Sequence, residues 1–303
     1  MKLYKNEEDF RDAVIAAANH FHVNPAIVEK DYFMTLILEK LKDSIPGILF
    51  KGGTSLSKCH HVIRRFSEDI DLTLDASHFT QANKRGANKA VIAVCDELGF
   101  AIDNREQVQL HGHGNYNCYM IQYSAIFSET GIKPYIQLEM TFIQKAYPDE
   151  YKPVCSLIGE FLLALGQEDA VSEYELTPYE IKVQALERTL IDKVFALCDY
   201  YLANTGIRQS RHIYDIHKLM MVADWRNKQQ LIREVRRERK PNKMCLSAQD
   251  GVSVTSVLDQ MIETAYYKKD YEEVTASLLS EPVDYETAVR SLSEIMESLV
   301  FDD

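Results

Sequence analysis

The chain has 303 residues, of which 46% are apolar and 26% are charged, so it is long enough to bury one large core or two ordinary ones. Its formal net charge of −12 disfavours adhesion to nucleic acid over the whole surface, although a local basic patch could still bind a phosphate backbone. The six cysteines form no CxxC pair, which argues against a disulfide framework and a structural zinc site, and the lack of a long apolar run predicts a soluble cytoplasmic protein without membrane helices.

The N-terminal part of the chain predicts helices followed by a strand, a glycine turn and a helix. The first 45 residues show the apolar spacing of two helices. A short apolar run at 48–50 predicts a buried strand that ends at Gly52 and Gly53. We expect a short helix over 54–65, after which alternation of apolar and polar residues over 66–74 predicts a second strand.

The remaining sequence changes from mixed patterns to helical ones. A helix is expected near 88–98, and further strands are expected at 108–110, 116–127 and 135–142. From about residue 154 the strand patterns fade, and the TPYE sequence at Thr177 resembles a capping box that opens a helix over 177–204. These patterns predict an α+β protein, with a mixed β-sheet flanked by helices over 1–153 and a helical bundle over 154–303.

Two aspartates are predicted to share one face of the strand over 66–74. Asp69 and Asp71 are two positions apart, which puts their side chains on the same side with α-carbons roughly 6.6 Å apart. Carboxylates this close repel each other unless a cation lies between them, and oxygen ligands suit Mg²⁺. Glu139, on the strand over 135–142, is a candidate third carboxylate. A solvated strand face is the simpler interpretation of either motif taken alone.

The glycine pair lies where a strand is predicted to lead into a helix. Free backbone amides and the helix dipole favour phosphate oxygens at such a place, and glycine lets the backbone approach them. Thr54 and Ser55 offer hydroxyls to the same anion, and Lys58 lies one turn further on. An ordinary helix N-cap after a turn is the alternative interpretation of this stretch.

Two charged residues in the helical half are predicted to lie at similar heights. Lys193 has no acidic neighbour one turn away on its own helix, and Asp215 lies on the next helix. If the two helices form an antiparallel hairpin, each residue lies roughly 16 Å from the turn. They could form an interhelical ion pair or face one cleft together. Further on, 226–243 holds eight Lys or Arg residues, which indicates a solvated helix face or a site for a nucleic-acid backbone.

Four stretches together resemble one known family. KGGTSLSK (51–58) followed by RRFSEDIDL (64–72) resembles the nucleotidyltransferase family that includes the AbiEii/AbiGii toxins of abortive-infection and toxin–antitoxin systems, a branch of the DNA polymerase β-like superfamily. RTLIDK, ending at Lys193, and RHIYDIHKL, containing Asp215, look like later motifs of that family. One departure is the spacing of 14 residues between Thr54 and Asp69, which is longer than usual in the superfamily.

The resemblance implies a nucleotidyltransferase fold with its active-site cleft completed by the helical domain. It implies that Asp69 and Asp71 bind Mg²⁺ (or Mn²⁺), that Glu139 completes the metal ligands, and that Lys193 and Asp215 are catalytic residues that line the nucleotide site. The nucleotide-binding residues that it implies are Gly52, Gly53, Thr54, Ser55, Lys58, Arg65 and Ser67, with bracing of the turn as the alternative role of Arg65.

The implied reaction moves a nucleoside monophosphate from a nucleoside triphosphate to an acceptor hydroxyl. The resemblance suggests a toxin with tRNA as its acceptor and a cognate antitoxin as its partner. Two alternatives stay open: transfer to a protein hydroxyl, and a nucleotide-binding regulator without catalysis. The acidic pair argues against the regulator, because repelling carboxylates are costly to keep without a metal.

Overall fold

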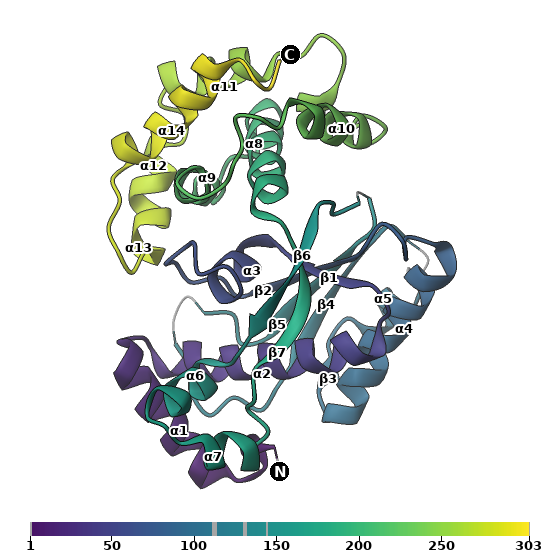
Figure 1. The fold of residues 1–303 in the computed structure, drawn as a ribbon, viewed down its shortest axis with the longest axis vertical. Helices are drawn as coiled ribbons and strands as arrows, with labels where there is room; N and C mark the ends of the chain where they lie inside the picture. Colours follow the sequence, from purple (N-terminus) through teal and green to yellow (C-terminus); the bar gives the residue numbers. More distant parts are fainter. Residues whose placement is uncertain (1, 111–113, 130–131, 144, 303) are drawn as a thin grey trace. The chain divides into compact units, whose positions relative to one another are not determined.

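The computed structural model describes residues 2–110, 114–129, 132–143 and 145–302 (Figure 1). Their contacts divide the chain into two compact units. The first unit comprises Met1–His60, Ser67–Phe142 and Asp149–Val183, and the second comprises His61–Phe66, Ile143–Pro148 and Gln184–Asp303. The predicted domains, 1–153 and 154–303, are a statement about which parts of the chain fold independently. That statement stays a prediction.

One mixed sheet organises the first unit. Its strand order in the described residues is β3-β4-β5-β2-β1-β7-β6. The strands are β1 (Ile48–Lys51), β2 (Asp69–Leu74), β3 (Ala101–Ile102), β4 (Tyr116–Gln122), β5 (Ile136–Thr141), β6 (Asp149–Val154) and β7 (Tyr179–Gln184). The central strand β2 pairs antiparallel with β1 and parallel with β5, so the predicted mixed sheet is confirmed.

Helices bury one face of this sheet. They are α1 (Glu7–Phe21), α2 (Pro25–Ser44), α3 (Gly52–Lys58), α4 (Gln81–Leu98), α5 (Arg105–Leu110), α6 (Leu157–Ala164) and α7 (Glu168–Glu173), with a 3₁₀ turn η1 at Leu3–Lys5. Apolar side chains of α2 and α4, such as Ile37 and Val91, join Ile70 and Leu138 of the sheet in one core. The alternation in β2 and β5 therefore leaves their polar side chains on the other, less buried face.

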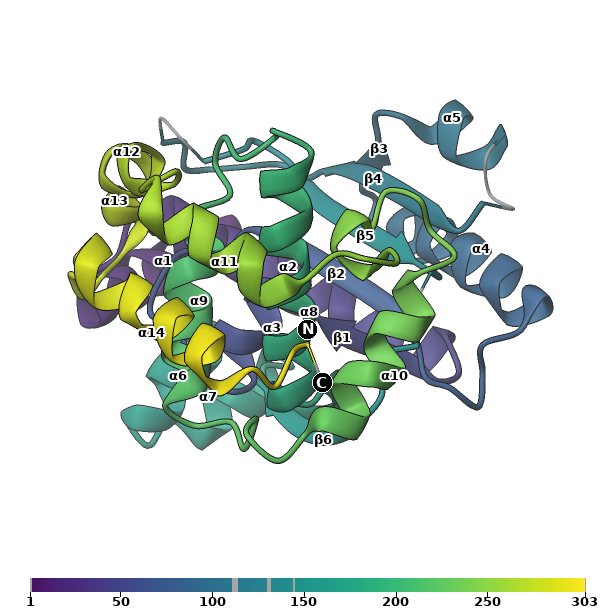
Figure 2. The ribbon, with the colours of Figure 1, turned by 90° about the horizontal axis from the view of Figure 1, so that it is seen from above.

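The second unit contains mainly helices. They are α8 (Leu186–Leu202), α9 (Arg211–Met220), α10 (Gln229–Arg239), η2 (Leu246–Ala248), α11 (Val254–Glu263), α12 (Lys268–Asp270), a π-helical turn η3 (Tyr271–Thr275), α13 (Ala276–Leu278) and α14 (Tyr285–Ser298). Four of them, α8, α9, α11 and α14, pack against one another (Figure 2). The predicted C-terminal helical bundle is confirmed, and no described helix has both the length and the hydropathy needed to span a bilayer.

Two predicted elements are wrong in type. The strand expected at 108–110 lies inside α5, because three residues cannot distinguish a strand period from one helix face. The helix expected from Thr177 begins only at Leu186, and the preceding stretch forms β7. There the buried β-branched residues Ile181 and Val183 alternate, and parallel pairing beside β1 outweighs the capping-box pattern. The predicted helix over 54–65 also ends early, at Lys58.

Candidate active site

The polar face of β2 presents the two predicted aspartates. Asp69 and Asp71 are partly exposed, whereas Ile70 between them is fully buried on the other face, so their predicted common side is confirmed. Strand pairing places Lys51 opposite Asp71 on one side and Glu139 beside it on the other. One row across the sheet therefore carries both a lysine and two carboxylates.

The glycine turn lies directly against one of these aspartates. Gly52 starts α3 with a φ of +79°, a conformation that favours glycine. A Cβ atom at this position would lie 1.9 Å from Oδ2 of Asp71, so only the absence of a side chain lets the carboxylate approach the backbone. The structure thus brings the acidic pair and the glycine turn together, as the sequence predicts.

The hydroxyl groups after the turn brace it. Thr54 is buried, donates its hydroxyl to the backbone carbonyl of Asp69, and lies 3.0 Å from Oγ of Ser67. The buried Ser55 donates to the carbonyl of Gly52 at 3.0 Å. These bonds tie the start of α3 to the start of β2, so Thr54 and Ser55 have a structural role whether or not they also contact a phosphate.

Lys58 is engaged away from the aspartate pair. Its ammonium group donates to Oδ1 of Asp31 at 2.5 Å and to the carbonyl of Cys155 at 2.8 Å. Asp31 also accepts from the backbone amide of Leu157. Lys58 therefore links α3 to α2 and to the start of α6. Its expected contact with a triphosphate would require this ion pair to break, and it stays a prediction.

A lysine that the sequence motifs did not single out contacts Asp69. Nζ of Lys133 lies 2.9 Å from Oδ1 of Asp69 and 3.0 Å from Oε1 of Gln137. Burial would lower the pKa of Lys133, but its hydrogen bond to Asp69 and the charge of that carboxylate more than offset this effect, so the pKa is raised. Gln137 in turn donates to Oε1 of Glu139 at 2.6 Å.

The carboxylates fit a magnesium site that uses two protein ligands. Among the described residues, no three His, Cys, Asp or Glu side chains come close enough together to hold a metal ion. Glu139 is the register partner of Asp71 across β2 and β5, and its role as a third metal ligand stays a prediction. Mg²⁺ is commonly held by one or two carboxylates, with water and substrate phosphates completing its shell. The two aspartates on one face of β2 match that donor chemistry.

The second unit contains a buried cluster of two cations and one anion. Nε and Nη2 of Arg65 each donate to one oxygen of Asp215 at 2.7 Å. Nζ of Lys193 donates to Oδ2 of the same carboxylate, also at 2.7 Å. The Asp215 side chain is fully buried, and those of Arg65 and Lys193 are 3% and 8% exposed. The predicted meeting of Lys193 and Asp215 is confirmed as an ion pair, which Arg65 joins.

Burial and the attraction between opposite charges shift the pKa values in this cluster in opposing directions. Burial would raise the pKa of Asp215, but the charges of Arg65 and Lys193 more than offset this effect and hold the pKa well below its ordinary value. Burial lowers the pKa of Lys193 against the opposing attraction of Asp215. The Asp215 carboxylate is therefore ionised, and both cationic side chains donate to it.

His212 extends the same neighbourhood on α9. Its ring stacks on that of Tyr200, with 5.7 Å between ring centroids, and its Nδ1 atom is buried without a hydrogen-bond partner among the described residues. Burial lowers the pKa of His212 well below the ordinary value, and the positive charge of Lys193 adds to this effect. The imidazole is therefore neutral at pH 7.

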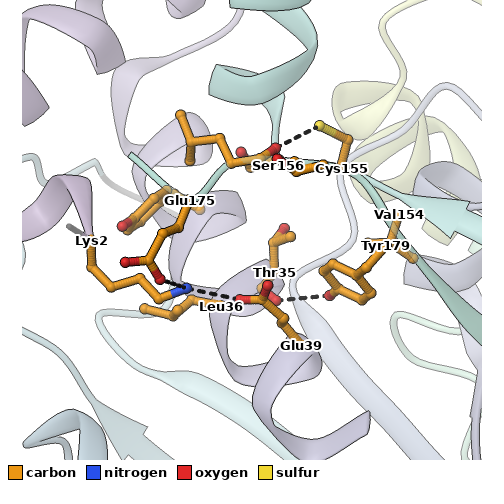
Figure 3. A pocket seen from close by; sticks show the side chains of 12 residues that line it. Lys2, Thr35, Leu36, Glu39, Val154, Cys155, Ser156, Glu175 and Tyr179 are labelled. Atoms are coloured by element: carbon orange, nitrogen blue, oxygen red, sulfur yellow. Dashed lines mark hydrogen bonds and ion pairs between the residues drawn. The ribbon is translucent and has the colours of Figure 1, made fainter. Parts of the chain in front are cut away.

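Two of the cavities of the protein are lined by residues other than the predicted site residues. One is a space of about 20 Å³ in the first unit, where Lys2 lies between Glu39 and Glu175 at 3.0 and 3.1 Å (Figure 3). It can hold about one water molecule, not a nucleotide. The other has about 300 Å³ and lies in the second unit beside Tyr271 and Tyr285.

Replacing Gly52 by alanine should destabilise the protein by at least about 1 kcal/mol, since the positive φ is strained for alanine and the new Cβ would displace the Asp71 carboxylate. Gly86→Ala is the matched control. Nothing lies within 4 Å of a Cβ at Gly86 in α4, so this change should stabilise by about 0.5–1 kcal/mol. Urea unfolding measures both, and equal stability changes in the two variants would contradict this account.

The lowered pKa of His212 predicts that stability falls as the pH decreases below about 6.5, the ordinary histidine value. Below that pH the unfolded chain binds a proton that the folded protein excludes, which costs up to about 1.4 kcal/mol per pH unit. The contribution is complete above pH ~6.5 and is lost as the pH falls toward the folded-state pKa. Urea unfolding between pH 7.5 and 5 should show a flatter dependence in His212→Gln. The control His61→Gln replaces an exposed histidine, and the same slope in His212→Gln as in this control would refute the assignment.

Comparison with known proteins agrees with the geometry. Residues 36–296 match the family described as nucleotidyl transferase AbiEii toxin, type IV toxin–antitoxin system. No curated protein matches the sequence.

MenT4, a nucleotidyltransferase toxin from Mycobacterium tuberculosis H37Rv, has a similar fold, with a TM-score of 0.62 and 17% identity over 94% of this chain and 89% of its own. JHP933 from Helicobacter pylori matches with a TM-score of 0.46 and 16% identity over 91% and 92% of the two chains. The predicted nucleotidyltransferase fold is thus confirmed, and because the family match covers most of its length, the chain belongs to the AbiEii family of nucleotidyltransferase toxins.

Proposed function

We propose that this nucleotidyltransferase transfers a nucleoside monophosphate from a nucleoside triphosphate to an acceptor hydroxyl, with a divalent cation held by Asp69 and Asp71. The observation that carries the proposal is the position of these two carboxylates on one face of β2, with Asp71 packed against the Gly52 backbone. The helix α3 begins at this glycine, and backbone amides at a strand-to-helix turn favour phosphate oxygens. The acceptor oxygen attacks the α-phosphorus and gives up its proton to solvent, the bond to the oxygen of the β-phosphate breaks, and pyrophosphate leaves.

The cation in this proposal is Mg²⁺ or Mn²⁺. When bound, it would neutralise the negative charge that develops on the phosphate oxygens. Asp69 and Asp71 supply its protein ligands, and their shared face follows from the two-residue period of the strand. The hydroxyl of Thr54, which donates to the carbonyl of Asp69, holds the first of these aspartates in register with the glycine turn.

Lys193 is proposed to offset phosphate charge, with Asp215 as the residue that orients it. The support is the direct contact of Lys193 with Asp215 and the resemblance of the RTLIDK and RHIYDIHKL stretches to the family motifs. Arg65 binds both oxygens of Asp215, which fixes the carboxylate and leaves one defined position for the lysine. Arg65 is thus a positioning residue in this proposal.

Asp69→Asn and Lys193→Ala should each reduce label transfer from an α-³²P-labelled nucleoside triphosphate by at least about 100-fold, because each removes a charge that stabilises the transition state. Lys89→Ala, at an exposed position of α4 without an ion pair among the described residues, is the control and should retain wild-type transfer. Circular dichroism checks that each variant is folded. Full transfer by both variants would refute the proposed roles.

For the acceptor we propose RNA, with tRNA as the acceptor that the family resemblance suggests. Only some of the basic residues at 226–243 support an RNA acceptor. Arg226 and Arg239 form ion pairs with Glu294 and Asp199, respectively. Arg233 and Arg237 are exposed one helical turn apart on α10 and have no ion pair among the described residues. They are the candidates for contact with a phosphate backbone.

Ribonuclease should release the label from the product formed with total RNA, and protease should leave it intact. An Arg233→Ala/Arg237→Ala double variant should transfer less label to RNA and show a shallower salt dependence, by about 0.7 per lost contact in the log–log slope. Label that protease removes and ribonuclease leaves would favour a protein acceptor. Triphosphate binding without pyrophosphate release in the presence of either acceptor would favour a regulator without catalysis.

Membership in a type IV toxin–antitoxin family implies a cognate antitoxin. We propose that the toxin acts in the cytoplasm, where nucleoside triphosphates and RNA are available. Expression without the antitoxin is then expected to arrest growth, and the same expression of Asp69→Asn is not.

A further inference from the structure

Lys133 forms an ion pair with Asp69, a carboxylate that the proposed function assigns to the metal. Its ammonium group lies 2.9 Å from Oδ1 of Asp69, within the first unit. We propose that Lys133 is a tethered counter-cation that competes with the divalent metal for Asp69 and thereby sets the metal affinity of the site. This inference rests on the proposed function, because it assumes that Asp69 is a metal ligand.

The backbone amide and carbonyl of Lys133 are both held by one ion pair, between Lys30 and Glu68. Its amide donates to Oε2 of Glu68 at 3.0 Å, and its carbonyl accepts from Nζ of Lys30 at 3.0 Å. Lys30 and Glu68 also bind each other, with 2.6 Å between Nζ and Oε2, and the Lys30 side chain is fully buried. The position from which the Lys133 side chain reaches Asp69 is therefore fixed by interactions that do not involve that side chain.

The position of the Lys133 ammonium group is fixed by its hydrogen bonds to Asp69 and Gln137. Oε1 of Gln137 accepts from it at 3.0 Å, while the amide nitrogen of Gln137 donates to Glu139. That second bond orients the Gln137 amide, so that its oxygen faces Lys133. Gln137 is also the register partner of Asp69 across β2 and β5. Two acceptors on neighbouring strands thus define one position for the ammonium group.

An ammonium group and a divalent cation cannot both be close to one carboxylate without strong repulsion. Like charges about 4 Å apart repel by several kcal/mol at the effective dielectric of a protein surface. The Lys133 side chain is 34% exposed, so it can leave Asp69 for solvent while its backbone anchors stay in place. Metal binding is therefore an exchange of one cation for another, and its affinity is reduced by the free energy of the Lys133–Asp69 pair.

The test measures metal binding to the full chain without nucleotide, from the electron paramagnetic resonance signal of free Mn²⁺. Lys133→Gln removes the competing charge and should lower the Kd for Mn²⁺ by about fivefold, as expected for a partly exposed ion pair of about 1 kcal/mol. Lys133→Met should act in the same way, whereas Lys133→Arg keeps the charge and should bind within about twofold of wild type. Lys89→Gln, an exposed lysine lost from α4, is the matched control for net charge and should leave the Kd unchanged.

The Asp69→Asn variant distinguishes failure of the proposed role of Lys133 from failure of the proposed function. Loss of Mn²⁺ binding in Asp69→Asn, together with unchanged or weaker binding in Lys133→Gln and Lys133→Met, would overturn the role of Lys133 and leave the proposed function standing. Equal tightening in Lys133→Arg would also overturn it, since the charge would then not be the cause. Absence of Mn²⁺ binding in wild type and all variants would overturn both proposals. Far-ultraviolet circular dichroism and urea unfolding confirm that each variant is folded.

Discussion

The candidate active site depends on one close approach, that of the Asp71 carboxylate to the backbone of Gly52. A side chain at Gly52 would fill the space that the carboxylate occupies, and the positive φ of that residue turns the chain from β1 into α3. Antiparallel pairing of β1 with β2 then places Asp71 opposite Lys51, and the two-residue strand period brings Asp69 to the same face. Most of the chemistry of the first unit follows from this turn and this register.

The charged groups of the two units have different electrostatic character. In the first unit, Asp69, Asp71 and Glu139 lie on the polar face of β2 and β5, where Lys133 contacts Asp69. In the second unit, Arg65 and Lys193 share the carboxylate of Asp215. Burial of such a cluster is costly unless every charge is hydrogen-bonded, and the bidentate contact of Arg65 meets that requirement for Asp215.

The sequence predicts features that depend on local periodicity. The shared face of Asp69 and Asp71 follows from a period of two, and the meeting of Lys193 with Asp215 follows from their equal distances to a helix turn. Contacts between distant segments are not encoded in this way. Neither the ion pair between Lys133 and Asp69 nor that between Arg65 and Asp215 has a local signal. The buried Lys30 of α2 likewise requires a partner, and it finds one in Glu68 on a distant segment.

The long spacing between the glycine turn and the aspartates has a structural explanation. Between them, the segment His61–Phe66 belongs to the second unit, where Phe66 and Arg64 exchange backbone hydrogen bonds with Leu278 and Ser280. The helical unit is therefore discontinuous in sequence, because it includes a segment that lies between the glycine turn and the aspartates. No single cleavage can release it intact. A fragment that starts after β7 would lack Arg65, whose guanidinium group binds both oxygens of Asp215. Recombination at a single junction could therefore not exchange the helical unit of this enzyme as a whole.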